Sequence, residues 1–157
     1  MTDRIMIAAP GNSDVSVAVV LSTERQASDY LACVGEAWGM ADSPPELVAA
    51  MFLTPRAVLV PEAAAFVAYV DGMPGAGCMT YVSHEVAGMY WAGTTAAGKG
   101  RGLGAACFVA AMDAGFAIGA RMASGQSSSK GTPIWVDLGF EVITHYRRYL
   151  VTPPRPS

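Results

Sequence analysis

The spacing of apolar residues in the first third of the chain predicts one strand followed by two helices. The block SVAVVLS (16–22) is apolar and β-branched, which predicts a strand. In TERQASDYLACVGEAWG (23–39) the large apolar residues recur at helical spacing, which predicts a helix that ends at Gly39. The segment ADSPPELVAAMFL (41–53) offers Ser43 as an N-cap before two prolines and predicts a second, short helix.

The middle of the chain has the pattern of consecutive strands. The segment AAFVAYVDGMPGAGCMTYVS (64–83) predicts two strands joined at 71–74, where Asp-Gly-Met-Pro is a strong signal for a hairpin turn. The segment VAGMYWAGTT (86–95) predicts a third strand. Because only short turns separate these segments, we expect an antiparallel meander.

Helices and strands alternate in the second half of the chain. A long helix is predicted over 102–119 and a strand over 120–128. Thr132 and Pro133 give an N-cap followed by proline at the first helical position, which predicts a short helix. The segment FEVITHYRRYL (140–150) predicts a last strand.

The resulting order of elements is β-α-α-β-β-β-α-β-α-β. This order indicates a mixed α/β (α+β) fold with a mostly antiparallel central sheet flanked by helices. No linker or internal repeat divides the chain. We therefore expect one domain over 14–150, a loose N-terminus over 1–13 and a flexible, proline-rich tail over 151–157.

Composition narrows the class of protein. The chain has 157 residues, 52% of them hydrophobic, which is enough for one domain with a core and argues against disorder. A net charge of −3 argues against a nucleic-acid partner or an anionic membrane surface. The longest apolar run, 103–120, contains Asp113 and glycines and suits a buried helix better than a membrane span. The N-terminus lacks the apolar core of a signal peptide, so we expect a cytoplasmic protein.

Cysteine and histidine usage points away from disulfides and metals. The three cysteines, Cys33, Cys78 and Cys107, are too few and too scattered for a disulfide framework. They are expected to be buried, reduced thiols. Neither they nor the two histidines show the spacing of metal ligands, so no metal site is expected.

The chemistry of the chain is concentrated in GTTAAGKGRGLGAACF (93–108). Glycines stand at every second position from Gly98 to Gly104, with Lys99 and Arg101 between them. The loop follows a predicted strand and precedes a predicted helix, so its amides lie at a helix N-terminus, where the backbone N–H groups lack partners. Such a site binds phosphate or pyrophosphate through amides and the helix dipole. A tight surface turn is the alternative structural explanation.

Two familiar glycine motifs do not fit this loop. The phosphate-binding loop of nucleotide hydrolases needs Lys and then Ser or Thr after its last glycine, but Ala105 and Ala106 follow Gly104. A dinucleotide-binding fingerprint has the spacing GxGxxG near the first strand, whereas this loop is GxGxGxG in mid-chain. A dinucleotide-binding oxidoreductase is therefore a distant alternative.

A third motif fits. The run Lys99 to Gly104 resembles the (Gln/Arg)-x-x-Gly-x-(Gly/Ala) loop of the GNAT superfamily of N-acetyltransferases, with Lys99 in the Gln/Arg place. The segment GQSSSKGTPIWVDLGF (125–140) is similar to the second signature of that family, which ends in Leu-Gly-Phe. The resemblance implies a GNAT-like fold and transfer of an acetyl group from acetyl-CoA (coenzyme A) to a primary amine of a small molecule or peptide. It also allows a homodimer.

The resemblance further implies which residues meet the cofactor. The loop amides would hold the pyrophosphate, and the strand before the loop would meet the pantetheine arm and the acetyl carbonyl. The cofactor-binding residues implied in this way are Ala92, Gly93, Thr94, Lys99, Gly100, Arg101, Gly102, Leu103, Gly104, Ala105, Ser128 and Trp135. Ser128 is equally suited to capping a turn.

The catalytic groups are less defined. Trp135 stands where the family usually has a tyrosine acid, and an indole N–H has no useful acidity. Water, or a phenol of Tyr146, Tyr149 or Tyr90, is then left to protonate the leaving thiolate; we name Tyr146. His84 is named as a base, although a solvated turn residue is the alternative. An acyl-CoA-binding module with little or no transferase activity remains the alternative function.

Overall fold

A computed structural model describes residues 15–19, 23–40, 43–44, 46–47, 58–147 and 149. The chain divides into two compact units, Met1–Gln126 and Ser127–Ser157, which are described separately below. The predicted loose N-terminus and tail lie outside the described residues, and the predicted limits of a single domain stay a prediction.

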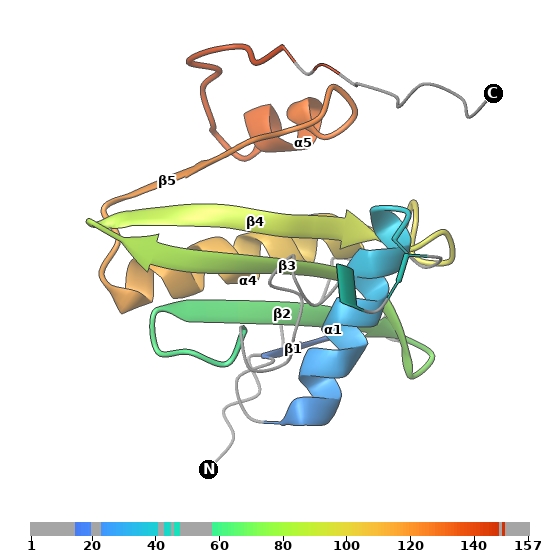
Figure 1. The fold of residues 1–157 in the computed structure, drawn as a ribbon. Coiled ribbons are helices and arrows are strands. Elements are labelled where there is room, and N and C mark those ends of the chain that lie inside the picture. Colours follow the sequence, from blue (N-terminus) through green and yellow to red (C-terminus); the bar gives the residue numbers. More distant parts are fainter. Residues whose placement is uncertain are drawn as a thin grey trace, which may run out of the picture. The chain divides into compact units, whose positions relative to one another are not determined.

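The first unit is built on a five-stranded sheet in the spatial order β1-β2-β3-β4-β5 (Figure 1). The strands β1 to β4 are antiparallel neighbours, and β5 runs parallel to β4. This arrangement confirms the predicted mixed, mostly antiparallel sheet. The strands are β1 (Val15–Val19), β2 (Ala63–Val70), β3 (Met73–Ser83), β4 (Val86–Thr94) and β5 (Met122–Gly125).

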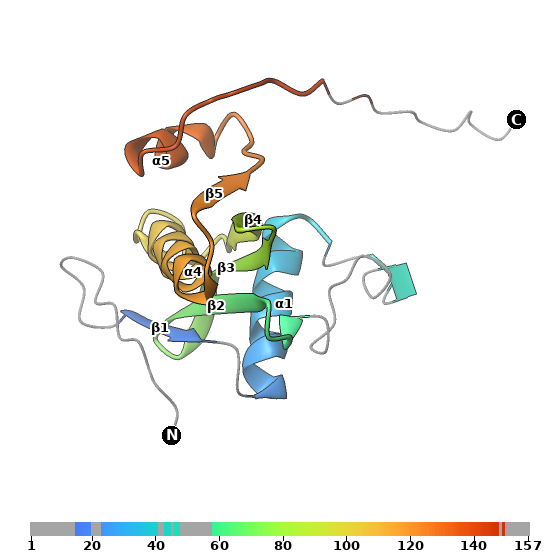
Figure 2. The same cartoon turned by 90° about the vertical axis from the view of Figure 1, so that its left-hand side faces the viewer.

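Two helices cover opposite faces of the sheet (Figure 2). The helix α1 (Glu24–Ala37) packs Tyr30 against Gly77 of β3, where a Cβ would lie 2.7 Å from the ring. The helix α4 (Leu103–Ile118) packs Gly115 against Ala87 of β4, where a Cβ would lie 2.6 Å from that side chain. Glycine at these crossings lets helix and sheet approach closely.

Local signals in the sequence set the limits of α1 and of the β2–β3 hairpin. The hydroxyl of Thr23 accepts a hydrogen bond from the N–H of Gln26 at 3.2 Å, as an N-cap does. In the hairpin turn Asp71 and Gly72 have φ of 51° and 76°, the left-handed pair that joins two twisted strands tightly. Both features follow from residue types that the sequence shows directly.

The core of the first unit lies between α1 and the sheet and between the sheet and α4. The strand β2 is almost wholly buried, because helices cover both of its faces. The largest fully buried side chains are Tyr30, Phe66, Leu103, Val34, Val58, Val67, Thr80, Cys78 and Cys107. The predicted burial of the thiols is confirmed, since all three cysteines are free and buried.

The strand predicted over 140–150 is wrong for the described residues, because 140–147 and 149 have no regular secondary structure. Its apolar side chains are exposed, Ile143 by 87%, so β propensity without a strand partner did not produce a strand. In the second unit the predicted short helix is present as α5 (Thr132–Asp137). Glu46 and Leu47 are helical, but the limits of that predicted helix lie outside the described residues.

Within the described part of the chain, no helix has the length and apolar character that crossing a membrane requires. No group of three or more His, Cys, Asp or Glu side chains in the same residues comes together in a way that suits a metal ion.

Replacing Thr80 by valine is expected to stabilise the protein. Thr80 is fully buried, and its Oγ1 has no hydrogen-bond partner among the described residues. Removing this unsatisfied hydroxyl while keeping the shape removes a desolvation cost, so Thr80→Val is expected to raise the free energy of unfolding by about 1 kcal/mol. Urea denaturation measures the change. Thr95→Val is the matched control and should lose stability, because the Thr95 hydroxyl donates to Gly75 O at 3.2 Å. A destabilised Thr80→Val would contradict this account.

The thiols make stability depend on pH. Burial raises the pKa of Cys33 to about 11 and that of Cys107 to about 12, whereas an unfolded thiol titrates near 8.5. The unfolded state therefore loses protons first, and stability falls as pH rises between these values. In reducing buffer, Cys33→Ala should make this fall shallower by up to about 1.4 kcal/mol per pH unit. Urea denaturation from pH 8 to 11 tests this, and identical slopes for the two proteins would refute it.

Candidate functional site

The strand β4 carries a β-bulge just before the glycine loop. Gly77 of β3 pairs with Gly93, but Met79 pairs with Tyr90, so one residue of β3 faces two residues of β4, Trp91 and Ala92. Trp91 has φ of 47°, a left-handed conformation that is rare for a bulky residue. The bulge turns its side chain onto the cluster that α1 forms with the sheet. Nothing in the sequence signals this bulge.

The helix α1 and its C-cap residue Trp38 contact the carbonyls of the bulge. The indole Nε1 of Trp38 donates to Ala92 O at 3.1 Å, and the Tyr30 hydroxyl lies 3.4 Å from Trp91 O, which is long for such a bond. The rings of Trp38 and Trp91 also meet edge to face with centroids 5.4 Å apart. The strained conformation of Trp91 is therefore supported by contacts from one helix.

The outer edge of β4 opens toward the glycine loop. Pairing between β4 and β5 runs from Val86 opposite Met122 to Met89 opposite Gly125. The strand β4 continues to Thr94, so its segment 90–94 has no partner strand on that side among the described residues. Unpaired N–H and C=O groups at a strand edge bind an extended ligand by adding it as a further strand.

The first part of the glycine loop is fixed by backbone packing. Gly75 O accepts hydrogen bonds from the N–H and the hydroxyl of Thr95, at 2.9 and 3.2 Å. The N–H of Gly98 donates a hydrogen bond to Thr95 O at 3.1 Å. Gly98 also lies so close to Gly75 O that a Cβ on Gly98 would collide with that oxygen. Between them, the N–H of Ala96 donates to Glu36 Oε1 at 2.9 Å. Gly98 is thus a packing requirement.

The second part of the loop is open. Gly100 and Gly102 have φ of 75° and 74°, and a Cβ at either would meet nothing within 4 Å. Gly102 is the N-cap of α4 and supplies no side-chain hydrogen bond, and the first turn of α4 contains no acidic residue. The first amides of this helix therefore keep the unpaired N–H groups and the positive end of the dipole that an anion requires.

Two exposed cations flank these amides. Lys99 and Arg101 are both exposed. Arg101 lies 4.0 Å from the carboxylate of Asp71 in the β2–β3 turn, and both side chains are partly in solvent. An exposed pair at this distance is weak, so Arg101 remains able to turn toward an anion. The two cations suit a ligand with more than one negative charge.

The strand residues before the loop have structural contacts of their own. A Cβ on Gly93 would lie 2.6 Å from the Cβ of Ala37, so its small size lets α1 approach the strand. The hydroxyl of Thr94 is 2.6 Å from the position that a Cβ on Gly104 would take, so Gly104 lets the first turn of α4 approach β4. Together, Ala92, Gly93 and Thr94 run from the bulge directly into the loop.

Tyr90 directly precedes the bulge in β4 and carries an exposed phenol. Its ring covers Gly88, where a Cβ would collide with it, and the side chain is 50% exposed. Tyr90 is the cross-strand partner of Met79, which belongs to the core cluster that includes residues of α1. Both side chains therefore lie on the face of the sheet that α1 covers. A phenol next to an unpaired strand edge has access to both solvent and a bound ligand.

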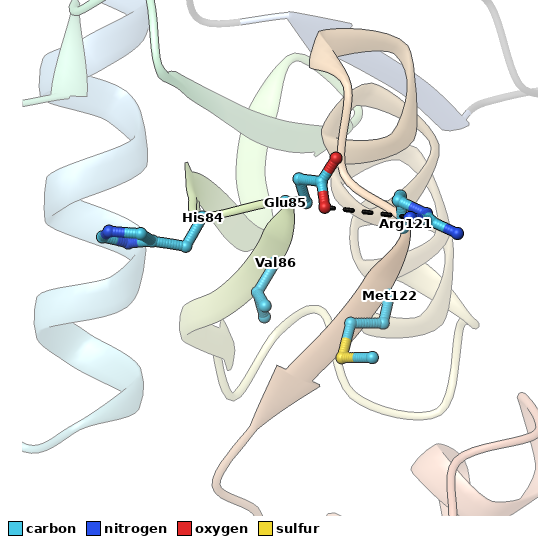
Figure 3. A pocket seen from close by; sticks show the side chains of 5 residues that line it. All are labelled: His84, Glu85, Val86, Arg121 and Met122. Carbon is cyan, nitrogen blue, oxygen red and sulfur yellow. Dashed lines mark ion pairs between the residues drawn. The ribbon is translucent and has the colours of Figure 1, made fainter.

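His84 lies far from the loop. It occupies the β3–β4 turn with φ of 50°, and its Nδ1 is 2.8 Å from Ser83 Oγ. The strand β4 separates it from Thr94, and nine residues of strand span about 26 Å. A cavity of about 240 Å³ at this end is lined by His84, Glu85, Val86, Arg121 and Met122. Figure 3 shows His84 pointing away from the Glu85–Arg121 ion pair, so the groups do not converge.

The remaining predicted site residues belong to the second unit. Ser128 Oγ accepts a hydrogen bond from Gly131 N at 3.2 Å, so it caps the turn before α5. Trp135 meets Phe140 edge to face with ring centroids 5.0 Å apart. Tyr146 is 74% exposed. Because this unit is described separately, the assignment of these three residues to the cofactor site stays a prediction.

The two kinds of loop glycine should respond differently to alanine. Gly98→Ala forces a side chain into Gly75 O and is expected to destabilise the protein by about 3 kcal/mol or more, as overpacking against backbone does. Gly102→Ala meets no atom and bears only the left-handed strain, about 1–2 kcal/mol. Urea denaturation of both variants compares them. Equal losses would show that Gly98 is not the packing point of the loop.

Comparison with solved structures identifies the fold. AAC(6')-Iy, solved with the bisubstrate analogue CoA-S-monomethyl-acetylneamine, superposes with a TM-score of 0.70 at 16% identity, over 90% of this chain and 100% of that one. An acetyltransferase from Trypanosoma brucei gives 0.65 at 18% identity, over 88% and 100%. Glucosamine-6-phosphate N-acetyltransferase from Arabidopsis thaliana gives 0.64 at 10% identity, over 87% and 99%.

These similarities concern the fold. A search against models of protein families found no match, and a search of curated proteins also found none. The structural neighbours are nevertheless acetyltransferases, and the superpositions cover most of both chains.

Proposed function

We propose that this chain, which has the fold of the GNAT superfamily of N-acetyltransferases, transfers an acetyl group from acetyl-CoA to a primary amine of a small molecule or peptide. The observation that carries the proposal is one continuous segment. The unpaired edge of β4 over 90–94 leads into a glycine loop and then into a helix N-terminus without a side-chain cap. This order suits a ligand with an extended, amide-bearing arm attached to a pyrophosphate.

Each part of the segment has a role toward coenzyme A. The amides from Gly100 to Ala105 and the dipole of α4 would hold the pyrophosphate, and Lys99 and Arg101 would balance its remaining charge. The edge groups of Ala92, Gly93 and Thr94 that α1 does not already bind would pair with the amides of the pantetheine arm, since Ala92 O accepts from Trp38 Nε1. Gly100 and Gly102 fit this role, because the space above them is open to an anion. When bound, acetyl-CoA supplies a thioester whose carbonyl carbon an amine attacks and whose thiolate leaves.

The residues of the bulge are suited to the acyl carbonyl. Backbone N–H groups of a distorted strand stabilise the negative charge that develops on such an oxygen, provided that they are held rigidly. Here the bulge at Trp91 and Ala92 is contacted by Tyr30 of α1 and by Trp38, the C-cap of that helix. The attacking amine must lose a proton and the leaving thiolate must gain one. For the proton of the leaving thiolate we name the phenol of Tyr90, the half-exposed residue that directly precedes this bulge, with Tyr146 as a second candidate.

The names of two structural neighbours support an amine acceptor. One was solved with an analogue built on acetylneamine, and another is named for acetylating glucosamine-6-phosphate. Both acceptors are amino sugars. For this chain we propose the broader class of primary amines, with a cytoplasmic location and a homodimer as further proposals.

An acyl-CoA-binding module is the second candidate function. The observation in its favour is that His84, the base named from the sequence, lies at the far end of β4. Trp135 also favours the binding module, because it stands where the family usually has a tyrosine acid and an indole N–H has no useful acidity. Turnover decides between the two candidates. CoA release over a panel of amines can be read with a thiol reagent, because the cysteines of the protein are buried and their thiols react slowly.

Binding of CoA tests the loop assignment directly. By calorimetry, Gly102→Glu is expected to weaken binding roughly 30-fold, because it places a negative charge and a side chain at the anion site. Gly119→Glu is the matched control, since it adds the same charge at another left-handed glycine at the opposite end of α4. Equal affinity of wild type and Gly102→Glu would refute the loop assignment. Release of CoA at the background rate for every amine would favour the binding module.

A further inference from the structure

The C-terminal end of α1 contacts the proposed cofactor segment at two points. Trp38 Nε1 donates to Ala92 O at 3.1 Å, and Glu36 Oε1 accepts from Ala96 N at 2.9 Å. Ala92 lies in the bulge, and Ala96 lies at the beginning of the glycine loop. The two bonds therefore hold both ends of the short stretch that joins the proposed acyl site to the proposed phosphate site.

The position of Glu36 is electrostatically unfavourable unless it has this role. It lies in the last turn of α1, where the helix dipole disfavours negative charge, and no basic residue is present in that turn. It also lies beside a loop to which the proposed function assigns an anion. The hydrogen bond from the Ala96 amide is the interaction that offsets these two costs. A residue chosen for helix stability alone would be neutral or basic here.

Trp38 fixes the orientation of a peptide group. A trans peptide is planar, so its C=O and N–H point in opposite directions. Because Ala92 O is held toward α1, the N–H of Gly93 points away from α1. Trp38 is 55% exposed, so burial of its ring is not its main contribution. Its donor group selects one orientation of this peptide in a strand that the bulge has already distorted.

We propose that Glu36 and Trp38 are positioning residues for acetyl transfer, acting through the backbone of Ala96 and Ala92. The proposal rests on the proposed function. Trp38 sets the direction of the bulge peptide and so affects the rate of the chemical step. Glu36 sets the beginning of the glycine loop and so affects the binding of acetyl-CoA. The same helix thereby aligns the thioester with the phosphate site.

Steady-state kinetics of four variants test the proposal. Trp38→Phe keeps an aromatic ring and loses the donor, and is expected to lower kcat about five-fold while KM for acetyl-CoA stays within two-fold. Glu36→Gln and Glu36→Ala have equal charge, but only the first keeps an acceptor for the Ala96 amide. KM for acetyl-CoA is therefore expected to be about five-fold higher in Glu36→Ala than in Glu36→Gln. Glu62→Gln, which changes an exposed carboxylate in the turn just before β2, is the control and should leave both constants unchanged.

The outcomes separate the two levels of the proposal. If the wild type binds CoA and releases it with an amine, and the variants show the expected split between kcat and KM at an unchanged melting temperature, the proposal holds. If the wild type is active and the variants match it, or if their losses follow melting temperature alone, the positioning roles are overturned and the proposed function stands. If the wild type neither binds CoA nor releases it, the positioning roles and the proposed function are both refuted.

Discussion

The contact between Gly98 and the carbonyl of Gly75 determines where the rest of the site lies. Gly75 O accepts two hydrogen bonds from Thr95, and Gly98 closes over it with no room for a Cβ. This contact holds the residues after β4 against the beginning of β3, next to the β2–β3 hairpin turn. After Gly98 the chain must change direction before α4 begins at Leu103. Gly100 and Gly102, which both have positive φ, make this change of direction. The direction of the helix N-terminus therefore follows from the packing of two glycines.

A second constraint is the strained bulge in β4. A bulky residue with φ of 47° costs free energy, and such conformations persist where surrounding contacts determine them. Here the contacts come from α1, whose side chains meet the carbonyls and the ring of the bulge. Since strained backbone concentrates at functional sites, the bulge and the open strand edge beside it are consistent with one ligand site. Stability and site geometry are thus maintained by the same helix.

Local rules were enough to predict most of the fold from the sequence. The Asp71-Gly72 turn and the glycine loop before α4 each follow from residue types with defined conformational preferences. The strand predicted over 140–150 failed, because strand formation depends on a neighbouring edge and the sequence does not say where that edge is.

The candidate site was predictable only in part, for the same reason. The loop glycines were visible in the sequence, but the bond between Glu36 and Ala96 joins positions 60 residues apart. The bulge depends on the register of two strands, which periodicity does not report. The distance of His84 from the loop, by contrast, follows already from the strand predicted over 86–95, which separates the two.

The central claim is that the amides at the start of α4 bind a pyrophosphate. Backbone amide chemical shifts of the 157-residue protein, recorded during titration with CoA and separately with pantetheine, test it most directly. CoA is expected to shift the amide signals from Gly100 to Ala105 strongly, whereas pantetheine, which lacks the pyrophosphate, is expected to leave them unchanged. Saturation with CoA that leaves these amides unmoved would contradict it.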